Sequence, residues 1–103
     1  MNIETASEIL AALAQQARLR IFRTLVEAGP DGMSAGAIAQ ALDIPPATLS
    51  FHLKELKHAG VAHCRRDGRS LIYSPDFEAM ASLLSFLTEN CCQRTSGGAE
   101  ASP

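Results

Sequence analysis

The residues best suited to chemistry in this sequence are two adjacent cysteines, Cys91 and Cys92, near the end of the chain. Soft thiolates select soft ions, and two neighbouring thiols can chelate trivalent arsenic or antimony without bringing distant parts of a fold together. Their Cα atoms lie about 3.8 Å apart across a trans peptide, which is below the roughly 4.4–6.8 Å that disulfides usually span. The pair therefore favours a thiol site over a structural disulfide.

A third cysteine, Cys64, lies far from this pair in the sequence. An odd number of cysteines in a chain that is not cysteine-dense is typical of reduced thiols in a cytosol. A predicted helix from Phe77 to Cys91 would be roughly 21 Å long at about 1.5 Å per residue. A site joining Cys64 to Cys91 within one chain is therefore disfavoured. Cys64 remains a further candidate ligand across two subunits, or a small buried apolar residue.

A second group of candidate residues is basic and lies in the middle of the chain. The net charge of all 103 residues is −2. Residues 46–74 nevertheless hold five lysines and arginines against two acidic residues, a net charge of +3, together with three histidines. Because a local basic patch matters more for DNA binding than the total charge, this segment is a candidate DNA-binding region.

The helices that must position these residues follow from apolar spacing and from start and stop signals. Four helices are predicted in the first 60 residues: one capped by Thr5 or Ser7, one over about 17–28, one over 35–42 capped by Ser34, and one that begins at Pro45 or Pro46 and stops at Gly60. The last two are short and are joined by a tight turn. This pair predicts a helix-turn-helix.

The segment "VAHCRRDGRSLIYS" predicts a β-hairpin, because Asp67-Gly68 stands between two β-prone runs. The cross-strand pairs expected from a two-residue turn are Arg66 with Arg69 and Cys64 with Leu71. The hairpin would form a wing whose tip carries three arginines.

A last helix is expected over about 76–90. Its apolar residues recur at steps of three or four and form one stripe: Phe77, Met80, Leu84, Leu87 and Cys91. The predicted fold is mainly α with a β-hairpin, in the order α-α-α-α-β-β-α. This is a winged helix-turn-helix over residues 1–92, followed by a small polar tail, residues 93–103, that is typical of disorder.

In a helix-turn-helix the second helix enters the major groove, led by its N-terminal residues. The candidate DNA contacts on that helix are Thr48, Ser50, Phe51, His52 and Lys54. Thr48, Ser50 and His52 carry short hydrogen-bonding groups that can reach phosphates or base edges. Phe51 either packs on the wing or touches a thymine methyl group.

The wing supplies three further candidate contacts, Arg65, Arg66 and Arg69. These side chains can contact backbone phosphates or an adjacent minor groove. The alternative, for both the helix and the wing, is a solvated polar surface.

Two stretches resemble the ArsR/SmtB family of metal-sensing repressors. "LAALAQQARLRIFRTLVEAG" is similar to that family's opening helices, and "ATLSFHLKELKHAGVAHCRRDGRSLIYS" to its recognition helix and wing. The resemblance covers roughly residues 6–92, and its S-x-H-L and R-x-G-R elements are fairly specific. It implies a homodimer formed through the first and last helices, which represses a promoter until an inducer binds. It also implies Ser50, His52 and the wing arginines as contacts to double-stranded operator DNA.

The sequence departs from that family at two inducer sites. "DGMSAGAIAQAL" has no cysteine where the familiar arsenic site has a Cys-x-Cys pair, and "DFEAMASLLSFLTEN" has no histidine for a zinc site. Residues 89–92, "ENCC", resemble a third variant, in which adjacent cysteines at the end of the last helix sense trivalent arsenic. This implies Cys91 and Cys92 as ligands for arsenite, methylarsenite or antimonite, with no permanently bound cofactor.

Three other functions are weighed beside this one. The chain could be a thiol-based redox or persulfide-sensing repressor of the same fold, or a constitutive DNA-binding protein with inert thiols. An enzyme is disfavoured, because no nucleophile lies beside a base at a recognisable spacing. The sequence has no apolar run of about 18 residues that would predict a membrane span, and no secretory signal is visible. We therefore expect a cytoplasmic protein without a membrane partner.

Overall fold

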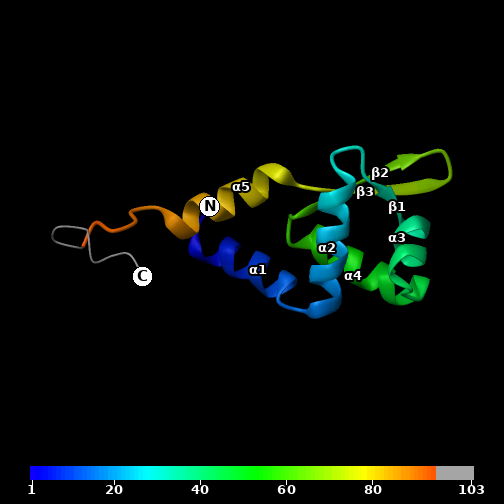
Figure 1. The fold of residues 1–103 in the computed structure, drawn as a ribbon, viewed down its shortest axis with the longest axis horizontal. Helices are drawn as coiled ribbons and strands as arrows, with labels where there is room; N and C mark the ends of the chain where they lie inside the picture. The colour runs from blue at the N-terminus through cyan, green and yellow to red at the C-terminus, as the bar shows by residue number, and fades with distance from the viewer. Residues whose placement is uncertain (95–103) are drawn as a thin grey trace.

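The computed structural model describes residues 1–94, and five helices and three strands lie in that part of the chain. In chain order they are α1 (Ile3–Leu13), α2 (Gln16–Ala28), β1 (Met33–Ser34), α3 (Ala35–Leu42), α4 (Pro46–His58), β2 (Ala62–Asp67), β3 (Ser70–Pro75) and α5 (Phe77–Thr88). Figure 1 shows α1 and α5 extending toward one end of the molecule, while α2, α3, α4 and the sheet form the other end. The predicted winged helix-turn-helix is confirmed.

Two of the three helix starts that the sequence predicts from particular residues are confirmed, those of α3 and α4. Ser34 Oγ accepts a hydrogen bond from the Ala37 N–H at 3.0 Å, and Pro46 is the first residue of α4. The cap predicted for α1 is wrong, because Asn2 takes that place and its Oδ1 accepts from the Thr5 N–H at 2.8 Å. Asparagine caps a helix as well as serine does, so α1 begins before Thr5.

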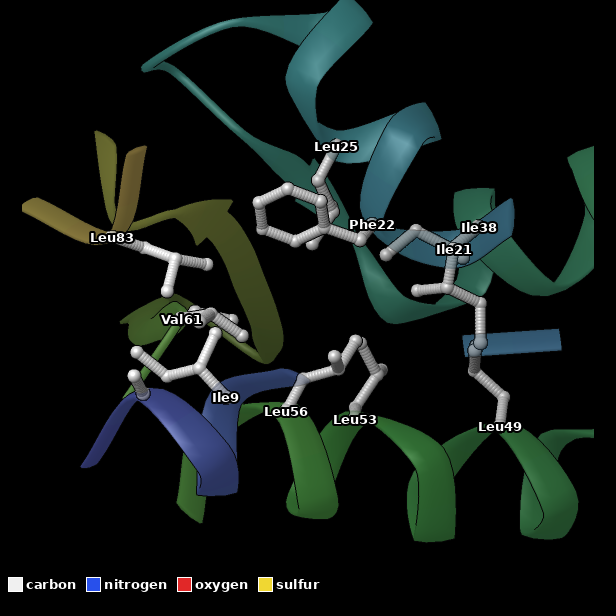
Figure 2. Close-up of a cluster of buried hydrophobic side chains, with 12 residues drawn as sticks. Ile9, Ile21, Phe22, Leu25, Ile38, Leu49, Leu53, Leu56, Val61 and Leu83 are labelled. Atoms are coloured by element: carbon white, nitrogen blue, oxygen red, sulfur yellow. The ribbon is translucent and has the colours of Figure 1, made fainter. Parts of the chain in front are cut away.

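The core forms where the helices and the sheet meet. Leu49, Leu53 and Leu56 are buried, as the spacing in α4 predicts. Figure 2 shows their side chains directed from α4 toward those of α2, with Val61 and Leu83 at the other end of the cluster. In α5 the buried residue is Leu83, whereas Leu84 and Leu87 of the predicted stripe are 61% and 53% exposed.

The sheet has three strands in the order β1-β3-β2, although the sequence predicts only a hairpin. In the additional strand, Met33 pairs with Tyr73 and Ser34 with Ile72. A two-residue strand is too short to show an alternating pattern. The chain reaches it through Gly32, whose φ is 82° and where a Cβ would lie 2.5 Å from the Tyr73 carbonyl oxygen.

The predicted register of the hairpin is wrong. The observed pairs are Asp67 with Ser70, Arg66 with Leu71, and Cys64 with Tyr73. The turn is therefore Gly68-Arg69, and Gly68 has a φ of 64°. A type II′ turn needs a positive φ only at its first central residue, where glycine is favoured. A turn centred on Asp67-Gly68 would force the aspartate into that conformation as well.

The end of α5 also differs from the prediction, because the helix stops at Thr88. Asn90 and Cys92 have φ values of 62° and 69°, and the Cys91 N–H donates to the Thr88 carbonyl oxygen at 3.2 Å. The two cysteines therefore lie in a turn beyond α5 and do not continue its apolar stripe. Of the predicted tail, residues 95–103 lie outside the described residues.

Candidate nucleic-acid interface and thiol site

Helix α4 presents four of its five candidate DNA contacts to solvent. Burial of Leu49, Leu53 and Leu56 fixes which side of the helix faces the core. With about 3.6 residues per turn, the other side carries the remaining positions. The exposed candidates there are Thr48, Ser50, Phe51 and Lys54. They form a mixed surface of hydroxyl groups, one aromatic ring and one positive charge.

His52 is the exception, and its expected exposure needs correction. The residue is 7% exposed, and its Nδ1 lies 3.5 Å from Nη1 of Arg18. An arginine side chain donates but cannot accept hydrogen bonds, so in the tautomer whose ring proton lies on Nε2, Nδ1 accepts from Arg18. Its side chain lies at the edge of the inner face of α4, since position 52 is three residues after the buried Leu49 and four before the buried Leu56.

Sequence reasoning did not identify Arg18 as a functional residue. Its Nε donates to the Ala12 carbonyl oxygen at 2.8 Å, so one guanidinium group joins the end of α1 to α4. The partners lie 6 and 34 residues away in the chain. No local pattern could reveal them, because an arginine on an amphipathic helix ordinarily faces solvent.

Phe51 is 57% exposed. Its ring centroid lies 5.7 Å from that of His52, with a tilt of 59° between the two planes. At this exposure, more than half of the residue's accessible surface is not covered by the wing. The ring therefore stands on the outer surface of α4, beside a buried neighbour.

The wing arginines differ from one another in their contacts. Arg65 donates from Nη2 to the Asp31 carbonyl oxygen at 2.9 Å, and its Nη1 lies 4.0 Å from Oδ2 of Asp67. It therefore attaches the wing to the loop before β1. Arg66 and Arg69 are exposed at or beside the turn of the hairpin.

One side-chain contact connects the wing to the start of α5. Asp76 accepts from the Ala79 N–H through Oδ1 at 2.8 Å, which caps α5, and its Oδ2 lies 3.1 Å from Nε2 of His63 on β2. The Asp76 N–H also donates to the Val61 carbonyl oxygen at 2.8 Å. The first turn of α5 is thus held to the strand that leads into the wing.

The thiol groups of Cys91 and Cys92 lie together at the surface. Both residues are exposed, and their Sγ atoms are 2.8 Å apart. The hydrogen bond with Cys91, with a smaller contribution from desolvation, raises the pKa of the Cys92 thiol. One soft ion could therefore be held by both sulfurs.

Cys64 is half-buried on β2, opposite Tyr73. Burial first, and then the hydrogen bond and charge of Cys64, raise the pKa of the Tyr73 hydroxyl. Strand β2, which carries Cys64, lies toward one end of α5, and the turn that carries the cysteine pair follows its other end (Figure 1), so one chain keeps Cys64 apart from the pair. Within residues 1–94, no group of three or more His, Cys, Asp or Glu side chains is arranged to hold a metal ion.

Among residues 1–94, no helix is both long and apolar enough to cross a membrane.

Comparison with known proteins places the chain among helix-turn-helix transcriptional regulators. Residues 13–65 match the family model of a helix-turn-helix domain. The nodulation protein NolR of Rhizobium meliloti is 31% identical over 88 residues, which are 85% of this chain and 70% of NolR.

Two solved structures resemble the fold. One is the homodimeric winged helix-turn-helix DNA-binding domain of a possible ArsR-family transcriptional regulator from Mycobacterium bovis. It has a TM-score of 0.70 and 28% identity over 84% of this chain and 77% of the other. The second is a possible transcriptional regulator for arsenical resistance, with a TM-score of 0.68 and 25% identity over 78% and 80% of the two chains.

Proposed function

The chain belongs to the ArsR/SmtB family of winged-helix transcriptional regulators, and we propose that it is an arsenic-responsive repressor. In this proposal a homodimer binds operator DNA and is released when a trivalent arsenical binds Cys91 and Cys92. The observation that carries the proposal is the pair of exposed sulfurs 2.8 Å apart. The likeness to a possible regulator for arsenical resistance supports it.

The chemistry of the pair favours a thiophilic ion. Thiolates are the ligands that soft ions prefer. Because the hydrogen bond with Cys91 raises the pKa of the Cys92 thiol, that thiol holds its proton more tightly, and an incoming ion must displace it. Trivalent arsenic takes three ligands, and two come from this pair. The third comes from the methyl group of methylarsenite, from a small thiol, or from the partner subunit.

Dimerisation would use the apolar residues that α1 and α5 leave exposed. The largest of these are Ile3, Leu10, Phe77, Leu84 and Leu87. The M. bovis neighbour is homodimeric, which supports the same assembly here. Two copies would then present two α4 helices to successive half-sites of an operator.

Release would begin in the turn that follows α5. Binding of one ion by both sulfurs constrains the backbone at Asn90 and Cys92, which adopt left-handed conformations. A change there shifts the end of α5 within the dimer interface, while the Asp76–His63 contact connects the start of α5 to the wing. A release of about 100-fold needs a coupling free energy of only about 3 kcal/mol.

A redox-sensing repressor is the second candidate. A disulfide between adjacent residues is strained, and strain alone would favour a disulfide between two subunits. The two sulfurs of one chain are nevertheless already within hydrogen-bonding distance, which favours a disulfide within the chain. Hydrogen peroxide could take two electrons and two protons from the thiols, giving one disulfide and two water molecules.

The test follows the fluorescence anisotropy of labelled DNA from upstream of the protein's own gene, bound to reduced protein. Arsenite, methylarsenite, antimonite, zinc and hydrogen peroxide are titrated in turn. Release by stoichiometric trivalent arsenicals is expected, together with loss of the response in the variant Cys91→Ser/Cys92→Ser. Cys64→Ser is the matched control and should respond as the wild type does.

Each other outcome has a definite meaning. Release by arsenicals from the double variant would overturn the assignment of the pair. Release by peroxide alone would favour the redox candidate. If no reagent releases the DNA, the thiols are inert and the regulator is constitutive.

A further inference from the structure

We infer that Phe51 is a specificity-determining residue. In each half of the operator its ring contacts the 5-methyl group of one pyrimidine, which in unmodified DNA is a thymine. The inference rests on the DNA-binding part of the proposed function and is independent of the inducer. It concerns the base sequence that α4 recognises.

The first argument is the position of the ring. Phe51 is a large apolar side chain, 57% exposed, in the N-terminal half of α4. Its exposed neighbours Thr48, Ser50 and Lys54 are polar. Most of the other large exposed apolar residues lie on α1, α2 and α5. Phe51 is therefore an isolated apolar group on the surface that a recognition helix turns toward DNA.

The second argument is the chemistry of the major groove. The edges of the four base pairs there offer hydrogen-bond donors, acceptors and one apolar group, the C5-methyl group of thymine. A phenyl ring cannot form hydrogen bonds with the donors and acceptors of the base edges. The base-specific interaction that it can make is therefore contact with the methyl group.

The third argument is that the ring already has a packing partner before DNA arrives. It lies against the His52 imidazole, with 5.7 Å between the ring centroids. His52 is buried and contacts Arg18, which is itself hydrogen-bonded to the Ala12 carbonyl oxygen. A side chain that is already ordered loses less conformational entropy on binding. The contact with one methyl group then retains more of its favourable free energy.

The experiment removes single methyl groups from DNA. Full-length wild-type protein first selects a duplex from a random-sequence library. Each thymine of that duplex is then replaced in turn by uracil, which lacks the methyl group and is otherwise the same base. Affinities are measured by fluorescence anisotropy for the wild type, for Phe51→Ala and for Lys54→Ala.

At one thymine position in each half-site, uracil should weaken wild-type binding by about four-fold, the factor that corresponds to burial of one methyl-sized group. Phe51→Ala should bind the thymine and uracil duplexes equally. Lys54→Ala is the matched control on the same helix, and it should lower affinity for both duplexes while keeping the difference between them. Thermal unfolding of each variant confirms that the exposed substitution leaves the fold intact.

Equal sensitivity of the wild type and Phe51→Ala to uracil at every position would overturn the inference. An absence of any effect of uracil on the wild type would do the same. If the protein selects no duplex, DNA binding itself fails and the inference fails with it. A DNA complex that ignores arsenicals would overturn only the inducer assignment and leave Phe51 as the reader of the methyl group.

Discussion

At the scale of single residues, the hydrogen bond between Cys91 and Cys92 controls how the pair reacts. Only the thiolate form of cysteine is a nucleophile. Because the hydrogen bond with Cys91 raises the pKa of the Cys92 thiol, a smaller fraction of that thiol is ionised at any given pH. Cys92 should therefore react slowly with iodoacetamide near neutral pH, and its rate should rise only at a higher pH than is usual for an exposed thiol.

The comparison that tests this is Cys91→Ala, which removes the hydrogen-bond partner. Its Cys92 should be alkylated faster at neutral pH, with the rate profile moved toward lower pH. Labelling rates over a pH series, measured by mass spectrometry in a Cys64→Ser background, report on the pair alone. If both proteins give the same profile, the interaction between the sulfurs does not affect reactivity.

Arg18 is the residue whose loss should affect both stability and recognition. Arg18→Ala leaves the Ala12 carbonyl oxygen and Nδ1 of His52 without their donor, which should lower the free energy of unfolding by about 1–2 kcal/mol. Urea denaturation measures this, with Arg23→Ala, exposed on the same helix, as the near-neutral control.

The same variant should lose part of the discrimination between thymine and uracil, because His52 no longer holds the Phe51 ring. A purely structural role for Arg18 would lower stability but leave that discrimination unchanged.

For α4, the sequence was a good guide to which residues face solvent and a poor guide to the contacts that they make. The buried leucines fix the helix face, and the exposure of Thr48, Ser50 and Lys54 agrees with it. His52 lies three residues after Leu49 and four before Leu56, so the same spacing places it at the edge of the core. Its contact with Arg18 depends on two helices packing together, which no single-helix pattern contains.

At the scale of elements, Asp76 does two things at the start of α5. Asp76→Ala removes the side-chain oxygen that caps the helix and the contact with His63. It should lower the free energy of unfolding by about 1–2 kcal/mol. Asp76→Asn keeps a good cap and loses only the charge beside a well-exposed histidine. This variant should therefore lower the free energy of unfolding by less than about 1 kcal/mol.

Chemical denaturation of the two variants separates the effect of the cap from the effect of the negative charge beside His63. Asp67→Ala, on the exposed wing, is the control and should change stability by less than about 0.5 kcal/mol. Equal losses for Asp76→Ala and Asp76→Asn would mean that the negative charge, and not the cap, stabilises the start of α5.

The elements that the sequence missed or misplaced are those fixed by contacts across the fold. Strand β1 exists because Met33 and Ser34 lie along β3. The hairpin register depends on where a positive φ is tolerated, and Gly68 can take the first turn position alone. Helix α5 ends at Thr88, whose Oγ1 donates to the Leu84 carbonyl oxygen at 2.9 Å, and Asn90 then tolerates a left-handed conformation. Apolar spacing contains none of this information.

At the scale of the whole molecule, the notable feature is an apolar surface that one chain leaves uncovered. Leu84 and Leu87 are more than half exposed on α5, and Ile3 and Leu10 are exposed on α1. Contiguous apolar surface on a small protein usually marks an interface. A second copy of the chain would cover it, which is the assembly the proposed repressor requires.

This assembly predicts that Leu84→Glu/Leu87→Glu is a folded monomer. Both side chains are more than half exposed in the single chain, so the glutamates disturb the interface and leave the core of each subunit intact. Sedimentation equilibrium should give the monomer mass, and circular dichroism an unchanged helix content. The matched control is Leu19→Glu, which places one charge on an exposed apolar position of α2 and should remain a dimer.

DNA binding should fall with dimerisation, because linking two binding modules raises avidity by about 10²–10⁴-fold over one module alone. The monomeric variant should therefore bind the selected duplex at least about 100-fold more weakly than the wild type, and as weakly as it binds a duplex with one half-site. If the variant stays dimeric, the interface lies elsewhere on the chain. If it is monomeric yet binds both duplexes as the wild type does, one α4 helix is sufficient. Movement of α5 could not then release the DNA, and the route from the thiols to the operator would have to pass through the wing.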